Sequence, residues 1–377
     1  MPQKQKQESD SAFKNWINAD LVKRIAAHIQ NHWADFDAKS FVKVSKDLAP
    51  LELKPRVQLL REALKEHLPE DYPKALALLL KAAKKPKANL SPLSGFDLWA
   101  FTEFIQKYGL EDFDKSLAAL HELTQLFTAE FAIRPFLIHH EAKTLKVLHQ
   151  WSQDKNVHVR RLVSEGSRPR LPWGEQLKSF IQDPTPTIAL LEKLKFDDEL
   201  YVRKSVANHL NDISKDHPQL AVQTAKKWLN GAPKAHEEKI NWIVRHALRT
   251  LLKKGDREAL KLLGYENKGK IRLQDLKVSA KAVRVGDYLE FSFVLNSSSA
   301  TQIMVDYVIH HKKSNGKNAP KVFKLTTKKM KAKETLEIKK KHSFKPITTR
   351  VYYPGTHYLE IMVNGQLLEK IPFELKK

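Results

Sequence analysis

The stretch NVHVRRLVSEG, residues 156–166, contains the element that decides the fold of the first two thirds of the chain. Its Val-Arg pair recurs at spacings of 43 and 42 residues, as Val159-Arg160, Val202-Arg203 and Val244-Arg245. Acidic turns at residues 154–156 and 197–199 precede the first two pairs. A period of about 40 to 47 residues is typical of HEAT-type helical hairpins. The recurrence therefore predicts a solenoid of HEAT-like repeats.

The sequence around these pairs is helical in character up to about residue 265. Leu, Ala, Lys and Glu dominate it, and apolar residues recur three and four positions apart, as in Leu76, Leu79, Leu80 and Ala83. One hairpin is too small to bury its own apolar face, so neighbouring repeats must stack into a slab with a concave face. The arginines of the repeat serve either the core and an Asp-Arg ladder between turns, or an anionic partner on the concave face.

After Tyr265 the hydrophobic pattern changes from a helical period to a period of two. Residues 288–295, 302–309 and 357–363 are rich in β-branched and aromatic side chains. Asn364-Gly365 lies between two apolar runs, as a tight hairpin requires. This part of the chain therefore predicts a β-sandwich.

The two patterns give the chain a multidomain organisation, an all-α HEAT-like repeat solenoid followed by an all-β sandwich. The joint is polar and contains glycine, as expected of a linker. We place a flexible N-terminus, the solenoid, the linker and the sandwich at residues 1–10, 11–265, 266–270 and 271–377.

The composition points to a nucleic-acid partner. The chain has 66 Lys and Arg against 43 Asp and Glu, a formal net charge of +23, and proteins this basic most often meet nucleic acid. The absence of cysteine excludes disulfides, thiolate zinc sites and a cysteine nucleophile, and favours a reducing cytoplasm. The aliphatic run around Leu76–Leu80 is far shorter than the about 20 residues that span a bilayer, so we expect neither membrane insertion nor secretion.

Motifs for other chemistries are missing from the sequence. There is no Gly-rich phosphate loop, no HExxH and no Ser-His-Asp signature. His139 and His140 are adjacent, and neighbours on a helix point about 100° apart, so they make a poor metal site. We therefore expect neither a metal nor a cofactor.

Residues 128–173 depart from a plain helical repeat. Gly and Pro end a helix at Glu165, where the helix macrodipole disfavours a negative charge. Arg168 and Arg170 are separated by proline in an extended loop, and their guanidiniums suit phosphate groups. Trp173 follows at the loop tip. The alternative is structural: Glu165 pairs within the repeats, the arginines form a solvated loop and Trp173 staples neighbouring repeats.

A run of lysines marks the sandwich. Residues 312–345 contain 13 lysines and two acidic residues. The functional interpretation is a surface that follows DNA phosphates, with Lys312, Lys313 and Lys317 at its start. The alternative is that lysine protects the edge strands of a sheet from pairing with other chains.

Four segments together resemble a known family. They are FAIRPF at residues 131–136, Trp151, NVHVRRLVSEG at 156–166 and RPRLPW at 168–173. They are similar to the AlkC branch of the HEAT-like-repeat DNA alkylation repair glycosylases. The similarity covers about residues 10–265.

The resemblance carries implications for the fold, the activity and the site. Some AlkC-type members append an immunoglobulin-like domain, which would match residues 270–377. The family excises cationic N3-methylated bases, 3-methyladenine and for this branch 3-methylcytosine, from double-stranded DNA, and the sister branch leaves the lesion in the base stack. Carried over residue by residue, the resemblance assigns the catalytic cleft to Glu130, Glu165, Trp173 and Asp212.

We expect a monomeric bacterial protein of base excision repair in the cytoplasm, associated with the nucleoid. Its partner would be duplex DNA containing alkylated bases. The residues expected to contact DNA are Arg134, His158, Arg160, Arg161, Arg168, Arg170, Arg203, Arg245, Lys312, Lys313 and Lys317.

The acidic residues suit this chemistry and separate it from the alternative. A 3-methylated purine is already cationic, so its departure needs no protonation, and carboxylates can stabilise an oxocarbenium-like sugar and place a water. The alternative function is a non-catalytic HEAT-repeat binder of distorted or branched nucleic acid. Such a binder has no use for ionised carboxylates that repel DNA, so Glu130, Glu165 and Asp212 favour the glycosylase.

Overall fold

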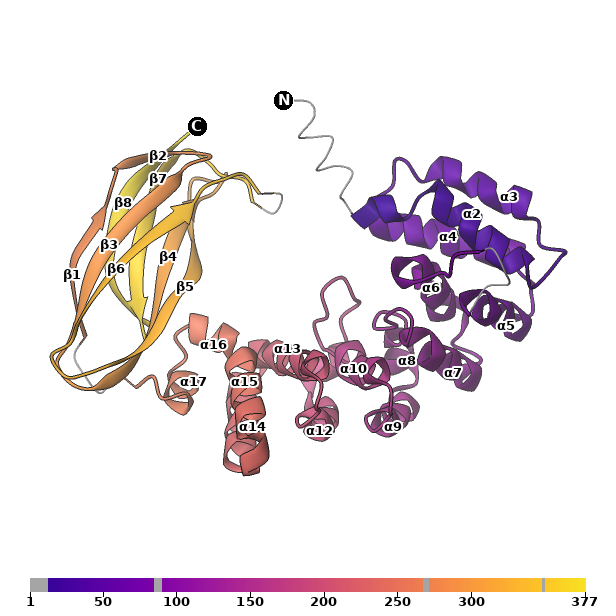
Figure 1. The fold of residues 1–377 in the computed structure, drawn as a ribbon, viewed down its shortest axis with the longest axis horizontal. Coiled ribbons are helices and arrows are strands. Elements are labelled where there is room, and N and C mark those ends of the chain that lie inside the picture. Colours follow the sequence, from indigo (N-terminus) through magenta and orange to yellow (C-terminus); the bar gives the residue numbers. More distant parts are fainter. Residues whose placement is uncertain (1–12, 85–89, 267–270, 348–349) are drawn as a thin grey trace. The chain divides into compact units, whose positions relative to one another are not determined.

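The computed structural model describes residues 13–84, 90–266, 271–347 and 350–377 (Figure 1). The expected flexible N-terminus at residues 1–10 and most of the expected linker lie outside the described residues. The packing of the chain divides it into two compact units, residues 1–216 with 234–243 and residues 217–233 with 244–377.

Helices build the first unit, and they begin and end at residues with clear local causes. Asn18 and Asp71 cap two of them by accepting hydrogen bonds from Leu21 N and Lys74 N, which satisfies donors that a helix start leaves free. Its main α-helices are α2 (Ala19–Gln30), α3 (Ala38–Val42), α4 (Leu53–His67), α5 (Tyr72–Ala83), α6 (Trp99–Tyr108), α7 (Phe113–Thr124), α8 (Arg134–His139), α9 (Glu141–Trp151), α10 (Val157–Gly166), α11 (Lys178–Gln182), α12 (Thr185–Leu194) and α13 (Leu200–Asp216).

Helical hairpins stack as the repeat predicts. The α9–α10 hairpin packs against the α12–α13 hairpin, with α10 on α13 and α9 on α12. Val159 and Val202, the valines of the repeated pair, are both fully buried. The prediction of an all-α HEAT-like part followed by an all-β part is confirmed.

The arginines of the repeat form a ladder between turns. Arg160 Nη1 donates to the carbonyl oxygens of Asp154 and Lys155 at 2.9 and 3.0 Å. Arg203 repeats the contact one hairpin later, donating to the carbonyl of Asp197 at 2.7 Å. Arg160 Nε also reaches the Asp197 carboxylate at 2.6 Å. These contacts favour the structural alternative for both arginines, and the expectation that they contact DNA stays a prediction.

The second unit joins the last helices to the sandwich. Gly255, between α16 (Arg249–Lys253) and α17 (Arg257–Leu262), has a φ of 73°. A Cβ at Gly365 would lie 2.5 Å from the Gly255 Cα, so the two backbones touch at a point where only glycine fits. The other helices of this region are α14 (Pro218–Asn230) and α15 (Glu237–Ala247), which spans the division between the units.

Two sheets form the sandwich. One has the strand order β1-β3-β6 and the other β2-β8-β7-β4-β5, antiparallel except for the β2–β8 pair. Their bounds are β1 (Ile271–Val278), β2 (Ala282–Arg284), β3 (Tyr288–Ser297), β4 (Thr301–Lys312), β5 (Asn318–Met330), β6 (Thr335–Ser343), β7 (Gly355–Val363) and β8 (Gln366–Lys376).

The alternating pattern explains the core of the sandwich. Along β3 every second side chain is buried, including Phe291 and Phe293. They join Tyr307 from the other sheet in one apolar cluster. Asn364-Gly365 connects β7 to β8, and both residues have positive φ, as the predicted hairpin requires.

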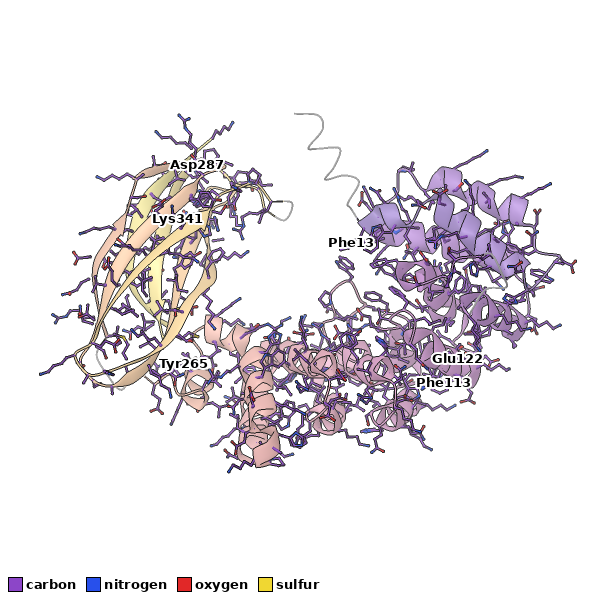
Figure 2. All side chains as sticks on the ribbon, viewed as in Figure 1. Phe13, Phe113, Glu122, Tyr265, Asp287 and Lys341 are labelled. Atoms are coloured by element: carbon purple, nitrogen blue, oxygen red, sulfur yellow. The ribbon has the colours of Figure 1, made fainter. Side chains whose placement is uncertain are left out.

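Lysines concentrate on the edges of these sheets. β5 and β6, which contain most of the lysine run, are the last strands of their sheets. Lys341 on β6 is exposed, and its Nζ lies 2.6 Å from Glu290 on β3 (Figure 2). This placement is the one that edge protection requires. Within the described ranges, every helix is too short or too polar to cross a membrane.

Candidate functional site

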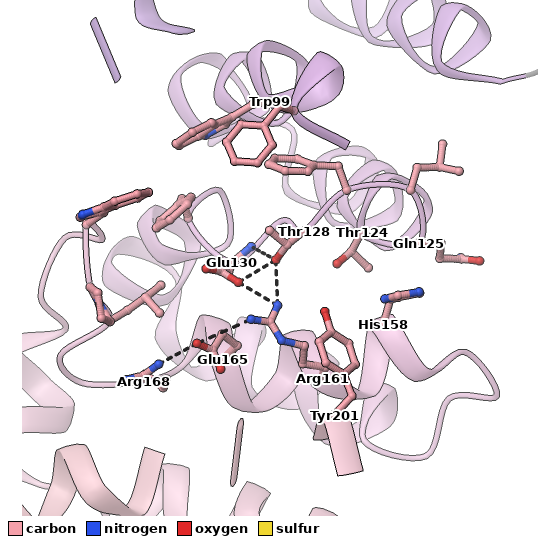
Figure 3. Close-up of a pocket in the computed structure, with 17 residues that line it drawn as sticks. Trp99, Thr124, Gln125, Thr128, Glu130, His158, Arg161, Glu165, Arg168 and Tyr201 are labelled. Atoms are coloured by element: carbon pink, nitrogen blue, oxygen red, sulfur yellow. Dashed lines mark hydrogen bonds and ion pairs between the residues drawn. The ribbon is translucent and has the colours of Figure 1, made fainter. Parts of the chain in front are cut away.

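A cleft of about 590 Å³ in the first unit collects the side chains that the sequence singled out (Figure 3). It is formed by the start of α6, the α7–α8 connection, α10 with the loop that follows it, and the start of α13. The residues that line it are Phe96, Trp99, Thr124, Gln125, Leu126, Phe127, Thr128, Glu130, Phe131, His158, Arg161, Glu165, Arg168, Leu171, Pro172, Trp173 and Tyr201.

The Arg161 guanidinium lies between two carboxylates of the cleft. Its Nη1 donates to Glu130 Oε2 at 2.8 Å, and its Nη2 lies 3.6 Å from Glu165 Oε1. The guanidinium carbon is 4.9 Å from the ring centroid of Tyr201, a cation–π distance. Thr128 Oγ1 donates to Glu130 Oε2 at 2.9 Å and fixes that carboxylate. The side chains of the cleft therefore surround a positive charge, and this charge is the protein's own Arg161 guanidinium.

Glu165 is buried and ionised. It lies at the end of α10 and is 6% exposed. Its two oxygens accept hydrogen bonds from Arg168 Nη1 and from Ser205 Oγ of α13, both at 2.6 Å. Burial raises the pKa of the Glu165 carboxyl, but Arg161 and Arg168 outweigh it and hold the pKa below its ordinary value. The carboxylate thus keeps its charge at neutral pH despite the unfavourable helix end.

Asp212 lies behind the cleft and not in its wall. It is 1% exposed on α13 and is absent from the cleft lining. Its oxygens accept from Arg168 Nε at 2.7 Å and from Lys215 Nζ at 2.8 Å. The family resemblance assigns Asp212 to the catalytic cleft, whereas the structure connects it to Glu165 through Arg168. Asp212 therefore holds Arg168 in place, and its part in catalysis stays a prediction.

Two arginines expected to bind DNA phosphates are buried instead. Arg168 is 7% exposed between Glu165 and Asp212. Arg134 is 1% exposed, and its Nη1 donates to the carbonyls of Gly166 and Arg168, both at 2.9 Å. The carbonyls at the end of a helix need donors, and Arg134 supplies them. Their burial favours a structural role for these two side chains, and their contacts with phosphate stay a prediction.

Arg134 thereby fixes the loop that carries Trp173. Trp173 is 61% exposed and has a φ of 65°, a left-handed conformation that is strained for a bulky residue. Lys54 Nζ from α4 holds the loop by donating to the Trp173 carbonyl at 2.8 Å. A Cβ at Gly166 would lie 2.5 Å from Ile133 Cγ2, so glycine is required where α10 ends. Backbone strain such as the left-handed conformation of Trp173 concentrates at functional sites.

Other expected contacts lie at the surface and stay predictions. Arg170 forms a two-pronged ion pair with Asp216, with both hydrogen bonds at 2.7 Å. His158 is exposed and lines the cleft. Arg245 is exposed and donates to the Tyr265 hydroxyl at 3.2 Å.

The lysines expected to contact DNA lie in the second unit. Lys312 ends β4, and Lys313 and Lys317 belong to the turn before β5, where Lys313 N donates to Lys317 O at 2.9 Å. In the described part of the chain these lysines form no ion pair with a carboxylate, so their charges are free for a partner.

Sequence reasoning missed three side chains that organise the site, Thr128, Tyr201 and Ser205. A signal for Tyr201 existed, because it precedes Val202-Arg203 as His158 precedes Val159-Arg160. The two rings meet at 5.7 Å in the structure. Aligning the repeats would have placed both beside the same cleft.

The arrangement can stabilise a positive charge electrostatically. Glu130 and Glu165 face one point, and an aromatic ring completes the surroundings. Charges of this kind act most strongly where protein excludes water. Among the described residues, no group of three or more metal-ligating side chains is arranged to hold an ion.

Comparisons with known proteins agree with this geometry. Residues 102–251 match the family model described as DNA alkylation repair enzyme, and residues 272–377 match the C-terminal Ig-like domain of the uncharacterised protein YhaZ. The chain is 41% identical to the uncharacterized protein YhaZ of Bacillus subtilis, covering 96% of this chain and 99% of that protein. It is 40% identical to Pseudomonas fluorescens alkylpurine DNA glycosylase AlkC, solved with DNA containing an abasic site analog. That match has a TM-score of 0.90 and covers 97% of this chain and all of the other.

Proposed function

The chain belongs to the DNA alkylation repair enzyme family, and from this premise we propose that it is a DNA glycosylase of base excision repair. Its substrates would be cationic N3-alkylated bases, 3-methyladenine and 3-methylcytosine, in duplex DNA. We place it in the bacterial cytoplasm with the nucleoid, acting as a monomer. The observation that carries the proposal is that the carboxylates of Glu130 and Glu165 hold a cationic group between them, the guanidinium of Arg161.

The proposed chemistry uses charges that the cleft already holds. A base methylated at N3 carries positive charge, so the glycosidic bond can break without protonation of the leaving group. Positive charge then develops on the deoxyribose. Glu165 is buried and ionised, and it would stabilise that charge while the base departs. Water would then attack the sugar, and Glu130, which also lines the cleft, would orient it.

Arg161 has to yield its place in this scheme. Its guanidinium lies where the two carboxylates converge, and a cationic nucleotide would compete for the same position. In the free protein Arg161 helps to hold the pKa of Glu165 below its ordinary value, and its charge offsets the repulsion between the two carboxylates and DNA. When the damaged nucleotide enters, the carboxylates exchange one cation for another. A neutral, undamaged nucleotide gains nothing from that exchange, which gives the site selectivity for damage.

Trp173 offers the aromatic surface for contact with the sugar or base. It lies on the same cleft as Glu165 and is exposed, with its backbone fixed by Lys54. Aromatic faces attract cations by about 0.5 to 2 kcal/mol. We also propose that the lesion stays stacked, following the family resemblance. Fluorescence of 2-aminopurine beside the lesion would test this, because a flipped neighbour raises its emission.

The experiment is excision of 3-methyladenine from a duplex under single-turnover conditions, scored as strand breaks at abasic sites in alkali. We expect the Glu165→Gln protein to react more than tenfold slower, a loss of about 1.4 kcal/mol for each decade, with duplex affinity kept or improved. Glu175→Gln is the matched control, because Glu175 is exposed and outside the cleft lining. If the wild-type protein binds the duplex but makes no abasic sites, the non-catalytic binder is the correct function.

A further inference from the structure

A second polar cavity of about 470 Å³ lies in the sandwich, where the turn between β4 and β5 meets the segment that begins at Arg350. No part of the proposed excision chemistry uses it. The residues that line it are His311, Lys313, Ser314, Ala319, Pro320, Lys321, Arg350, Val351 and Tyr353.

The charged side chains of this cavity are all cationic. Lys313, Lys321 and Arg350 line it, and within the described ranges none of them forms an ion pair with a carboxylate. Burial together with the positive charges of Arg350, Lys253 and Lys313 lowers the pKa of Lys321. The protein therefore gathers these cations against their mutual repulsion. A bound anion would remove that cost.

The Arg350 side chain is held in place before any ligand arrives. Its guanidinium carbon lies 5.9 Å from the ring centroid of Phe323 and 5.8 Å from that of Tyr352. Its Nη1 lies 3.2 Å from His311 Nε2. Arginine can only donate, so His311 Nε2 accepts and the ring proton is on Nδ1. Burial, followed by the charge of Arg350, lowers the pKa of His311 to about 3, which keeps the imidazole neutral.

His311 also has unused hydrogen-bonding capacity. The side chain is 4% exposed, and its Nδ1 is buried without a hydrogen-bond partner among the described residues. Because Nδ1 is closed to solvent, a ligand in the open cavity cannot reach it, and His311 contributes to the site through Nε2, which holds Arg350. A negatively charged group with several acceptor oxygens would pair with the cationic side chains that line the cavity.

We propose that this cavity, the Arg350 site, defined by His311, Lys313, Lys321 and Arg350, binds one phosphate group of a DNA backbone. The proposal rests on the proposed function and deepens it. A planar guanidinium binds phosphate oxygens in a two-pronged manner, and flanking lysines add point charges. Backbone phosphate is favoured over a free ion because two further basic residues adjoin the site, Lys312 at the end of β4 and Lys317 in the turn before β5.

The test measures how the affinity of the full-length protein for an undamaged duplex depends on salt. Each phosphate contact contributes about 0.9 to the slope of log affinity against log salt concentration. We expect Arg350→Gln and Lys321→Gln each to flatten the slope, and the double variant to lose about 0.9 in total because both side chains hold one phosphate. Lys321 is exposed, so its variant tests the site even if Arg350→Gln folds poorly. Unchanged slopes in all three variants would overturn the proposal.

Matched controls and a second ligand identify the source of the phosphate. Arg284→Gln and Lys370→Gln remove exposed charges elsewhere on the sandwich, outside the lysine run, and they should leave the slope unchanged. Calorimetric titration with inorganic phosphate at constant ionic strength is the second arm. Binding of inorganic phosphate that Arg350→Gln abolishes, without any change in the duplex slope, would assign the site to a free ion and overturn the DNA proposal.

Excision keeps this proposal separate from the proposed function. Arg350→Gln should retain the single-turnover rate of 3-methyladenine excision at saturating enzyme, because it lies outside the cleft. A flattened slope in a protein that makes no abasic sites would support the Arg350 site and refute the glycosylase. Normal excision with an unchanged slope would support the glycosylase and refute the Arg350 site.

Discussion

Replacing Arg168 by Met should destabilise the helical part of the protein strongly. The side chain is 8% exposed and pairs with Glu165 at 2.6 Å and with Asp212 at 2.7 Å. Both carboxylates are also buried, so without the guanidinium their charges lose a partner that water cannot replace. A phosphate-binding loop arginine would behave differently, since it would be needed for affinity and not for folding.

The size of the destabilisation depends on the hydrogen-bond and ion-pair partners that Glu165 and Asp212 retain. Breaking a buried ion pair typically costs about 3 to 5 kcal/mol. Asp212 retains Lys215 at 2.8 Å, and Glu165 retains Ser205 at 2.6 Å with Arg161 further away. We therefore expect the lower end, about 3 kcal/mol. With a urea m-value of about 1 to 3 kcal/mol/M, the midpoint falls by about 1 to 3 M.

Tryptophan fluorescence during urea titration is the assay. All seven tryptophans precede residue 243, so they report on the helices and not on the sandwich. Arg170→Ala is the control, because its pair with Asp216 is partly exposed and should contribute at most about 1 kcal/mol. Adding Asp212→Asn to Arg168→Met should recover part of the loss, since it removes one of the orphaned charges. Wild-type stability of Arg168→Met combined with weaker duplex binding would refute the reasoning.

Three further predictions concern charge and backbone. Arg161→Gln should slow excision at acidic pH and move the acid limb of its pH–rate profile to higher pH, because burial then raises the pKa of Glu165 with less opposition; a profile that falls equally at every pH would contradict this. Gly365→Ala should lower the stability of the second unit by about 1 to 3 kcal/mol, since the new Cβ meets Gly255 at a positive φ, and a calorimetric Tm equal to wild type would count against that contact. Burial raises the pKa of Asp306 to about 6, so the folded state binds this proton more tightly than the unfolded state and loses stability as pH rises through 4 to 6. Asp306→Asn should therefore raise Tm at pH 8 but not at pH 4, and an equal change at both would show that the charge is not the cause.

The fold was predictable because it depends on local patterns. The spacing of Val159, Val202 and Val244 follows from stacking, and all three are fully buried. The change to a period of two predicted the sandwich, and the positive φ of Asn364 and Gly365 is what their hairpin demands. These features need only neighbours in the sequence or a fixed repeat.

The site was predictable in its residue types but not in its pairings. Glu130, Glu165 and Trp173 do share one cleft. The role of Arg134 could not be read from its neighbours, because it serves carbonyls 32 and 34 residues later in the chain. The proline-containing segment around Arg168 is typical of an exposed loop, yet packing against α13 buries this side chain beside Asp212.

The Arg350 site shows the same limit in the sandwich. Lysine density marked residues 312–345, but Arg350 lies outside that run. The Arg350 guanidinium lies beside the rings of Phe323 and Tyr352. Phe323 is in turn fixed by the pairing of β4 with β5, in which it lies opposite Tyr307. Only the folded sheet brings these rings to the guanidinium.

The central claim is that the cleft stabilises a positively charged sugar through Glu165. The direct measurement compares affinities for two duplexes, one with a cationic pyrrolidine at the abasic position and one with neutral tetrahydrofuran. We expect the wild-type protein to prefer the cationic duplex by at least about tenfold, or 1.4 kcal/mol, and Glu165→Gln to lose most of that preference while Glu175→Gln keeps it. Equal affinity of the wild-type protein for both duplexes would contradict the account.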